Sequence, residues 1–342
     1  MTSASPYLEG TQGPYRGIVD YILGITHEIW ELREVEKILE YYSCDAQIFS
    51  LGGLLHGAAA VVESTRSTLQ AFPDRLLIGD AVIWSRDGVG QFYSSHRITS
   101  PMTNLGASAF GPATGRFARV TTIADCLVED GVIAKEWLVR DNLGLVRQLG
   151  LDPHVVARHA AARPLEAPFA AWLHSEHIRL RPRRDASVAR TDAYSGSLAS
   201  GFASAVLHNN WIAGEASAAA HHYAPYAVLH ESSPVASGRI EIDKHYAAMR
   251  HAFAGAALSV DHLCVRSCDL DAQDVAVRWT LSARHVDTVW GLPATGQPLY
   301  LLGVTHWRVV AGKIAAEWTI FDRIAALAQL YRASAAEGAR WR

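Results

Sequence analysis

Two aspartates have the surroundings that suit a residue for moving protons. Asp141 follows the run EDGVIAKEWLVR and Asp322 follows GKIAAEWTIF, so each ends an apolar segment that has a tryptophan four residues earlier. A carboxylate among apolar side chains loses solvation, which raises its pKa and suits it to general acid–base catalysis near neutral pH. Each aspartate also directly precedes an expected helix, so a helix N-cap is the alternative role.

Four of the 16 histidines could share this proton transfer. Two of them recur at equivalent places on a helix, each three residues before a tryptophan, so the two side chains of each pair share a helix face. A histidine packed in the core is the alternative role for these two. The other two occur only in the second half of the chain, which therefore has the fuller set. The candidate catalytic residues are Asp141, Asp322, His27, His208, His230 and His285.

Arginine and aromatic side chains could hold a substrate. A guanidinium in a pocket would bind a phenolate, enolate or carboxylate by charge and by paired donors, and a structural ion pair is its alternative role. Tryptophan and tyrosine suit a flat aromatic ligand, although the ten tryptophans of the chain also build its cores. The candidate substrate-binding residues are Trp30, Tyr93, Arg97, Trp137, Trp211, Arg278 and Trp318.

Alternation along the expected strands divides these residues between two faces. Tyr93 and Arg97 share one face of their strand and His96 lies on the other, and the sequence leaves open which face is turned inward. Glu136 and Glu317 lie on the face opposite the neighbouring tryptophans. We therefore expect both glutamates at an interface or in solvent.

Other kinds of site find little support in the sequence. It has no GxGxxG before a helix, no Walker loop, no GxSxG and no HExxH, and the histidines lack ligand-like spacing, so we expect no cofactor and no metal. Four scattered cysteines suggest neither a disulfide framework nor a zinc knuckle. With a net charge of -3, no extended basic face and no apolar run of about 18 residues, we expect no nucleic-acid partner, no membrane span and a cytoplasmic protein.

An internal repeat organises the chain. The turn Pro-Ala-Thr-Gly at 112–115 recurs at 293–296, and the same offset of 181 relates both EW pairs, both aspartates and both His-x-x-Trp motifs. A constant offset over more than a hundred residues indicates duplication. We expect a first domain at 15–151, a linker rich in Ala, Arg and Pro with some helix at 152–190, and a second domain at 191–335. The short basic patch at 179–184 falls in this linker and is expected to be solvated.

Each repeat has the same predicted elements. Apolar residues at helical spacing predict a long opening helix over 18–42 and again over 199–223. A short strand at 45–51 and a helix near 58–72 follow, and then strands at about 76–84, 89–100, 116–129 and 132–141. The turns at 129–131 and 311–313 are hairpin signals. This order predicts an α+β fold in which a curved, mostly antiparallel sheet wraps around helices and leaves a pocket.

Several of these motifs are similar to those of a known family. FPDRL at 72–76, the PATG turn, EDGVIAKEWLVRD at 129–141 and NLGLVRQLG at 142–150 resemble the SnoaL-like polyketide cyclases of the nuclear-transport-factor-2-like (NTF2-like) superfamily. The resemblance implies two tandem cone-shaped α+β barrels. It also implies that Asp141 and Asp322 occupy the place of the pocket aspartate that acts as general acid and base in an intramolecular aldol closure.

The resemblance also shapes the expected function. These cyclases tend to have a histidine two residues before that aspartate, where this chain has Val139 and Ile320. The difference favours a cofactor-independent carbon–carbon lyase, similar to the diarylpropane lyases that deformylate lignin-derived phenolics, acting on an aromatic or phenolic small molecule. A polyketide cyclase, a hydratase, isomerase or epoxide hydrolase, and a non-catalytic binding module are the alternatives. We expect the fused repeats to form a pseudo-dimer within the chain, and two chains could further associate into a homodimer.

Overall fold

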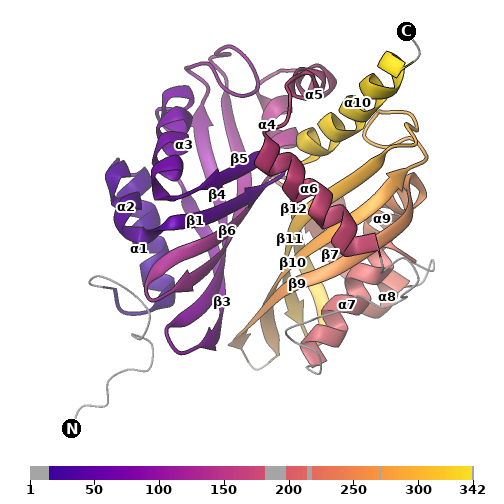
Figure 1. Cartoon of the computed structure of the whole chain (residues 1–342). Coiled ribbons are helices and arrows are strands. Elements are labelled where there is room, and N and C mark those ends of the chain that lie inside the picture. The colour runs from indigo at the N-terminus through magenta and orange to yellow at the C-terminus, as the bar shows by residue number, and fades with distance from the viewer. Residues whose placement is uncertain (1–14, 182–197, 214–217, 270, 341–342) are drawn as a thin grey trace. The chain divides into compact units, whose positions relative to one another are not determined.

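The computed structural model describes residues 15–181, 198–213, 218–269 and 271–340, and the chain divides into two compact units, Met1–Pro153 and His154–Arg342 (Figure 1). None of the helices in these described ranges combines the length and the apolar character that a membrane span requires. Each unit is described below by itself.

The first unit opens with helices and continues as a sheet. Its elements are α1 (Ile18–Trp30), a 3-10 turn (Val35–Lys37), α2 (Ile38–Tyr41), β1 (Tyr42–Ser50), β2 (Gly53–His56), α3 (Ala58–Ala71), β3 (Ile78–Gly88), β4 (Gln91–Thr103), β5 (Phe117–Glu129), β6 (Val132–Arg140) and α4 (Asn142–Gln148).

The second unit repeats this order after two connecting helices, α5 (Pro153–Ala162) and α6 (Ala167–Leu180). Its elements are α7 (Leu198–Trp211), α8 (Ala218–His222), β7 (Tyr223–His230), β8 (Pro234–Ser237), α9 (Arg239–Ala252), β9 (Phe253–Asp269), β10 (Ala272–His285), β11 (Pro298–Val310), β12 (Lys313–Phe321) and α10 (Arg323–Arg340). The last three strands begin 181 residues after β4, β5 and β6, so the tandem repeat is confirmed.

Each unit contains one mixed sheet of six strands. The order is β2-β1-β6-β5-β4-β3 in the first unit and β8-β7-β12-β11-β10-β9 in the second. All neighbouring strands are antiparallel except β1 beside β6 and β7 beside β12. The predicted hairpins are confirmed, since Asp130, Gly131, Ala311 and Gly312 all have the positive φ that a tight two-residue turn requires. The expected α+β fold class is confirmed for both units.

Helices cover one face of the first sheet. The apolar residues of α1 recur every three or four positions and bury one side of the helix, including Tyr21, Ile22, Ile25 and Ile29. This side packs into a core shared with residues of α3 and of the strands. In Figure 1, α1, α2 and α3 all lie on the same side of the strands.

The prediction of one long opening helix is wrong in both repeats. In the first unit α1 ends at Trp30, and Arg33 adopts a left-handed conformation with φ 64. An L-residue in that conformation cannot continue a right-handed helix. The Arg33 guanidinium donates to the Pro73 carbonyl over 2.8 Å, and the chain resumes as the 3-10 turn and α2.

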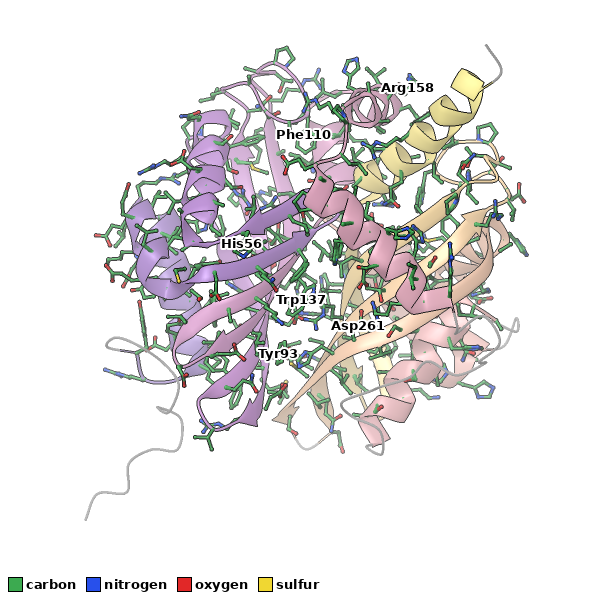
Figure 2. The ribbon with its side chains drawn as sticks, viewed as in Figure 1. His56, Tyr93, Phe110, Trp137, Arg158 and Asp261 are labelled. Carbon is green, nitrogen blue, oxygen red and sulfur yellow. The ribbon has the colours of Figure 1, made fainter. Side chains whose placement is uncertain are left out.

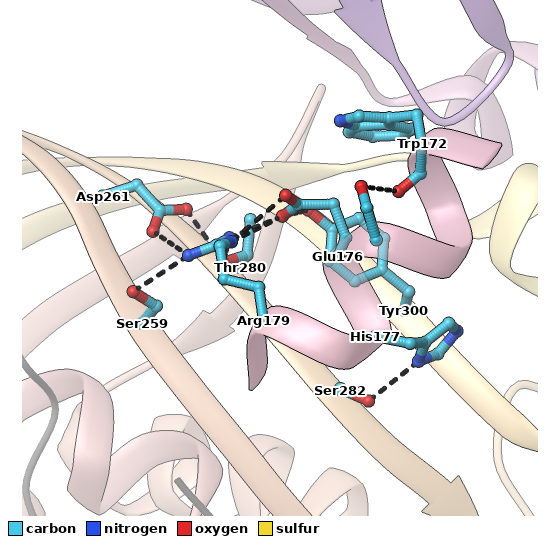
Figure 3. Close-up of polar contacts among 10 residues, drawn as sticks. Trp172, Glu176, His177, Arg179, Ser259, Asp261, Thr280, Ser282 and Tyr300 are labelled. Atoms are coloured by element: carbon cyan, nitrogen blue, oxygen red, sulfur yellow. Dashed lines mark hydrogen bonds and ion pairs between the residues drawn. The ribbon is translucent and has the colours of Figure 1, made fainter. Parts of the chain in front are cut away.

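Helix α6 covers part of the second sheet, and its polar contacts are drawn in Figure 3. Arg179 donates to Thr280 Oγ1 over 2.8 Å and pairs with Asp261 at 3.0 Å, while Tyr300 donates to Glu176 over 2.8 Å. The expectation that the basic patch is solvated is therefore wrong for Arg179. The remaining arginines of the patch beyond residue 181 lie outside the described residues.

Candidate active site

The first unit contains a partly open cavity of about 110 Å³ between its helices and its sheet. Side chains of α1 and α3 line one side, and inward-facing residues of β1, β4, β5 and β6 line the other. Most of this lining is apolar, with Ile and Leu side chains from both layers. A small number of polar groups in an apolar cavity is typical of a small-molecule site.

Glu136 on β6 is the acidic residue of this lining. Its side chain is buried, with 6% exposed, and burial raises the pKa of the carboxyl above its usual value. Tyr42, at the start of β1, donates to Glu136 Oε2 over 2.8 Å, and no other described residue hydrogen-bonds this carboxyl. Desolvation raises the pKa of Tyr42 as well, so the phenol keeps its proton and remains a donor.

Two arginines bring positive charge to the same cavity. Arg75, in the connection between α3 and β3, is 4% exposed and lines the cavity together with Arg140 of β6. Burial, together with the neighbouring Arg140 guanidinium, lowers the pKa of Arg75 to about 9. The Arg75 guanidinium lies over the Trp30 ring at 4.7 Å from the centroid, a cation–π contact.

Three other polar side chains of the lining lack a hydrogen-bond partner among the described residues. They are the Ser94 hydroxyl, His96 Nε2 and the Thr122 hydroxyl, and all three atoms are buried. Burial lowers the pKa of His96 to about 4, so its ring is neutral at pH 7. Buried polar groups are nearly always hydrogen-bonded in native proteins. Three such groups around one cavity therefore indicate that a ligand or water completes them.

The equivalent interior of the second unit is filled by aromatic side chains. At the offset of 181 residues, Trp279 takes the place of the cavity residue Ile98 and is fully buried. Gly303 makes room for it, since a Cβ at that position would lie 2.1 Å from the Trp279 ring. The Trp279 ring packs against Trp211 at 4.9 Å and Phe321 at 6.1 Å between centroids.

Glu317, the counterpart of Glu136, is enclosed by hydroxyl groups. Tyr223, Tyr246 and Thr319 all donate to its carboxylate. Tyr246 stands where the first unit has the cavity residue Thr65, so a tyrosine ring fills this part of the second unit. The carboxyl of the second unit is thus satisfied by the protein itself, whereas that of the first unit faces a cavity.

Comparison with known proteins identifies the second unit. A family model described as "SnoaL-like polyketide cyclase" matches residues 200–330. The second unit is a SnoaL-like domain. The first unit shares its order of elements and its sheet topology with this domain. A search of curated proteins gives no match to the chain.

Several solved structures are similar to part of the chain. TsrD from Streptomyces laurentii is 23% identical, with 39% of this chain and 94% of its own covered, at a TM-score of 0.35. IdmH, a putative polyketide cyclase from Streptomyces antibioticus, is 22% identical over 38% of this chain and 96% of its own, at 0.33. A putative SnoaL-like polyketide cyclase from Jannaschia sp. is 14% identical over 40% and 92%, at 0.35.

Both predicted catalytic aspartates act as helix N-caps, Asp141 in the first unit and Asp322 in the SnoaL-like domain. Asp141 Oδ1 accepts from the Gly144 backbone N–H over 2.9 Å, and Asp322 Oδ1 accepts from the Ala325 N–H over 2.9 Å. This is the alternative role that the sequence allowed. Asp141 is not part of the cavity lining, and its catalytic role stays a prediction.

Several predicted substrate-binding aromatics lie on the sheet face that is turned away from the cavity. Trp137 stacks on Phe49 at 5.4 Å and on Tyr93 at 6.3 Å, and Figure 2 places Tyr93 and Trp137 on the side of the strands away from α1, α2 and α3. In the SnoaL-like domain His230 stacks on Trp318 at 5.1 Å in the same way.

The expectation that Glu136 and Glu317 lie at an interface or in solvent is wrong. Alternation did place the glutamates and the tryptophans on opposite faces. The helices cover the glutamate face, so Glu136 and Glu317 are buried inside their units.

The other predicted histidines have structural contacts. His285 accepts from the Thr295 backbone N–H over 3.3 Å and holds the PATG turn, as the side chain of Asn104 does over 2.9 Å in the first unit. His27 is 54% exposed and pairs with Glu31. His208 is half-buried near the end of α7, where its carbonyl accepts from the Ile212 N–H.

The remaining candidates divide between the cavity and other places. Trp30 lines the cavity, as predicted for a substrate-binding residue. Trp211 is buried in the core of the second unit. Arg97 forms an ion pair with Asp80 at 4.0 Å, which is the alternative role that the sequence allowed, and Arg278 is buried on β10 beside His262.

A metal site finds no support in the part of the chain that is described. No group of three or more His, Cys, Asp or Glu side chains there could hold a metal ion. The four cysteines are free. The polar groups of the cavity are consistent with acid–base chemistry by side chains.

Sequence reasoning did not single out Arg75, Arg140, Ser94 or Thr122. Arg75 belongs to the FPDRL motif, which carries the family resemblance but has no pattern that indicates burial of its arginine. Glu136 could have been found from its recurrence as Glu317, since a charged residue kept in both copies beside a tryptophan is a candidate for burial. The sequence does not show which face of the sheet the helices cover, and this face decides whether the glutamate is buried.

Proposed function

We propose that the first unit is a cofactor-independent acid–base enzyme that moves a proton from or to a carbon next to a carbonyl group, in an aldol or retro-aldol reaction on an aromatic or phenolic small molecule. One observation carries this proposal. Glu136 is a buried carboxyl with a raised pKa, it has a single hydrogen-bond partner among the described residues, and it lines a cavity. The match of the second unit to polyketide cyclases supports an enzyme of this kind.

Several polar groups of the cavity have roles in this chemistry. The Glu136 carboxylate accepts the proton from carbon, and a base with a raised pKa is better matched to that transfer near neutral pH. Negative charge then develops on the carbonyl oxygen, where Arg140 stabilises it. The hydroxyls of Ser94 and Thr122 are further donors for that oxygen. Glu136 afterwards returns its proton to the product.

One set of groups could serve the reaction in either direction, bond making or bond breaking. A cyclase needs a base for the carbon proton. A retro-aldol lyase needs a base for the hydroxyl proton and an acid that returns this proton to carbon after the bond breaks, and both reactions need donors for the enolate oxygen. A cavity of about 110 Å³ is smaller than the roughly 150 Å³ apolar cavity that accepts benzene. A substrate with two rings, such as a lignin-derived diarylpropane, would therefore place no more than one ring inside it.

Deuterium exchange tests this proposal without knowledge of the natural substrate. Acetophenone and phenylacetone have protons next to a carbonyl that exchange slowly in neutral D2O, and proton NMR follows their loss. We expect the full chain to accelerate exchange of at least one of them, and Glu136→Gln to abolish the acceleration. Asp141→Asn, which keeps an N-cap side chain, is the matched control and should retain it.

Two results would contradict the proposal. One is exchange at the buffer rate with both ketones, and the other is unchanged exchange in Glu136→Gln. Formaldehyde release from a phenolic 1,3-diol, measured colorimetrically, separates the lyase from the cyclase, because only the deformylation releases that product.

A further inference from the structure

Arg75 is a buried cation without a carboxylate partner among the described residues. Its Nε and Nη2 both point to one acceptor, the Ser100 hydroxyl, at 3.4 Å each, which is long for a hydrogen bond. Its other described contact is the face of the Trp30 ring. A guanidinium that is 96% buried normally pairs with an anion, since removal of a charge from water is unfavourable without a partner.

The charges around the cavity do not balance. Arg75 and Arg140 are cationic, whereas Glu136 is the single carboxylic acid among the described lining residues. His96 is neutral at pH 7. The positive charge of Arg75, which pairs with none of the described carboxylates, is therefore one that a bound anion would neutralise.

The second unit has the same fold without these charged residues, so the charges are a property of the cavity. The residue that replaces Arg75 is Ala256, and the residue that replaces Arg140 is Phe321. Ser94 and His96 are both replaced by valines. Where the interior is filled, the counterparts of these arginines and of the Ser94, His96 and Thr122 side chains are absent, although the glutamate and its tyrosine remain. The fold thus stands without the arginines, and their function belongs to the cavity.

We propose that the cavity binds a small carboxylic acid, with the carboxylate of the ligand paired with the guanidinium of Arg75. This inference rests on the proposed function and adds the substrate class: an aromatic acid or keto acid whose buried part is no larger than one ring. The planar guanidinium offers paired donors to a carboxylate. Trp30, which lies under the guanidinium, provides an aromatic surface beside the bound group.

Benzoate and its uncharged isostere benzamide test this proposal. Binding to the full chain is measured by ligand-observed saturation-transfer NMR and by titration calorimetry at pH 7. We expect benzoate to bind at least tenfold more tightly than benzamide. Arg75→Gln should weaken benzoate about ten- to a hundredfold, which is the effect of losing a hydrogen bond to a charged group, and should leave benzamide unchanged.

Two further variants make the result specific. Arg66→Gln removes an exposed arginine of α3 that pairs with Glu36 and Glu63, and should leave benzoate binding unchanged. Arg75→Lys keeps the charge without the paired donors and should bind benzoate with intermediate affinity, which also covers a failure of Arg75→Gln to fold. Circular dichroism verifies folding of each variant.

The outcomes distinguish this proposal from the proposed enzyme. Equal binding of benzoate and benzamide, no binding of benzoate, or benzoate binding unaffected by either Arg75 variant would overturn the carboxylate site. Glu136→Gln should still bind benzoate, because it removes the base and not the cation. If benzoate binds through Arg75 while no ketone exchanges in D2O, the carboxylate site stands and the proposed catalysis fails.

Discussion

The filled interior of the second unit depends on a pair of residues that can be exchanged for those of the first unit. Trp279 occupies the position of Ile98, and Gly303 occupies that of Thr122. The Trp279 ring is fully buried, and a Cβ on residue 303 would overlap it at 2.1 Å. Each residue is therefore expected to be tolerated only with its present partner.

The expected magnitudes follow from packing. Trp279→Ile leaves a cavity and should lower the free energy of unfolding by about 2–4 kcal/mol, somewhat less than a truncation to alanine. Its ring N–H bonds Thr305, whose hydroxyl keeps a 2.9 Å contact with Thr319, so no acceptor is stranded. Gly303→Thr, with Trp279 in place, forces an overlap and should lower stability by about 1–3 kcal/mol.

The double variant should be more stable than the sum of the single effects predicts. Threonine at 303 fills space that isoleucine at 279 leaves open, so we expect a favourable coupling energy of about 1–3 kcal/mol. Urea denaturation and calorimetry of the full chain measure it. Exchange activity of the first unit, which contains neither residue, verifies that this unit is intact. Additive effects within about 0.5 kcal/mol would refute the claim that Trp279 and Gly303 together fill the second interior.

Three more predictions concern the first unit. Burial raises the pKa of Glu136 in the folded protein and so disfavours the ionised carboxylate there, which means that stability is lost as pH rises through that pKa. Glu136→Gln should therefore raise Tm relative to wild type at pH 8 and not at pH 4, and an equal gain at both pH values would contradict this. Thr65→Tyr introduces the tyrosine that Tyr246 provides in the second unit, and should abolish both ketone exchange and benzoate binding while circular dichroism remains that of wild type; retained binding would mean that the cavity stays open. Asp141→Ala should lower stability by about 1 kcal/mol in urea titrations and leave exchange unchanged, whereas a loss of exchange with normal stability would restore its catalytic role.

The sequence by itself determined the repeat, its elements and the division of each strand into two faces. The offset of 181 residues, the glycine-containing hairpins and the position of Asp141 before a helix are all local or periodic features. They depend on backbone conformation and side-chain period, which neighbouring residues fix. For that reason an N-cap was already one of the two roles that the sequence alone predicted for Asp141.

Only the tertiary structure decided which face is inside and which unit holds a cavity. A strand period of two separates Glu136 from Trp137, but the helices that cover one face select which of them is buried. Arg75 lies in a connection without periodicity, so only packing brings it to Trp30 and the cavity. The second unit has the fuller set of histidines. The part of its interior that corresponds to the cavity is filled, because a glycine on one strand admits a tryptophan from the next, and such a cross-strand fit has no signal along the chain.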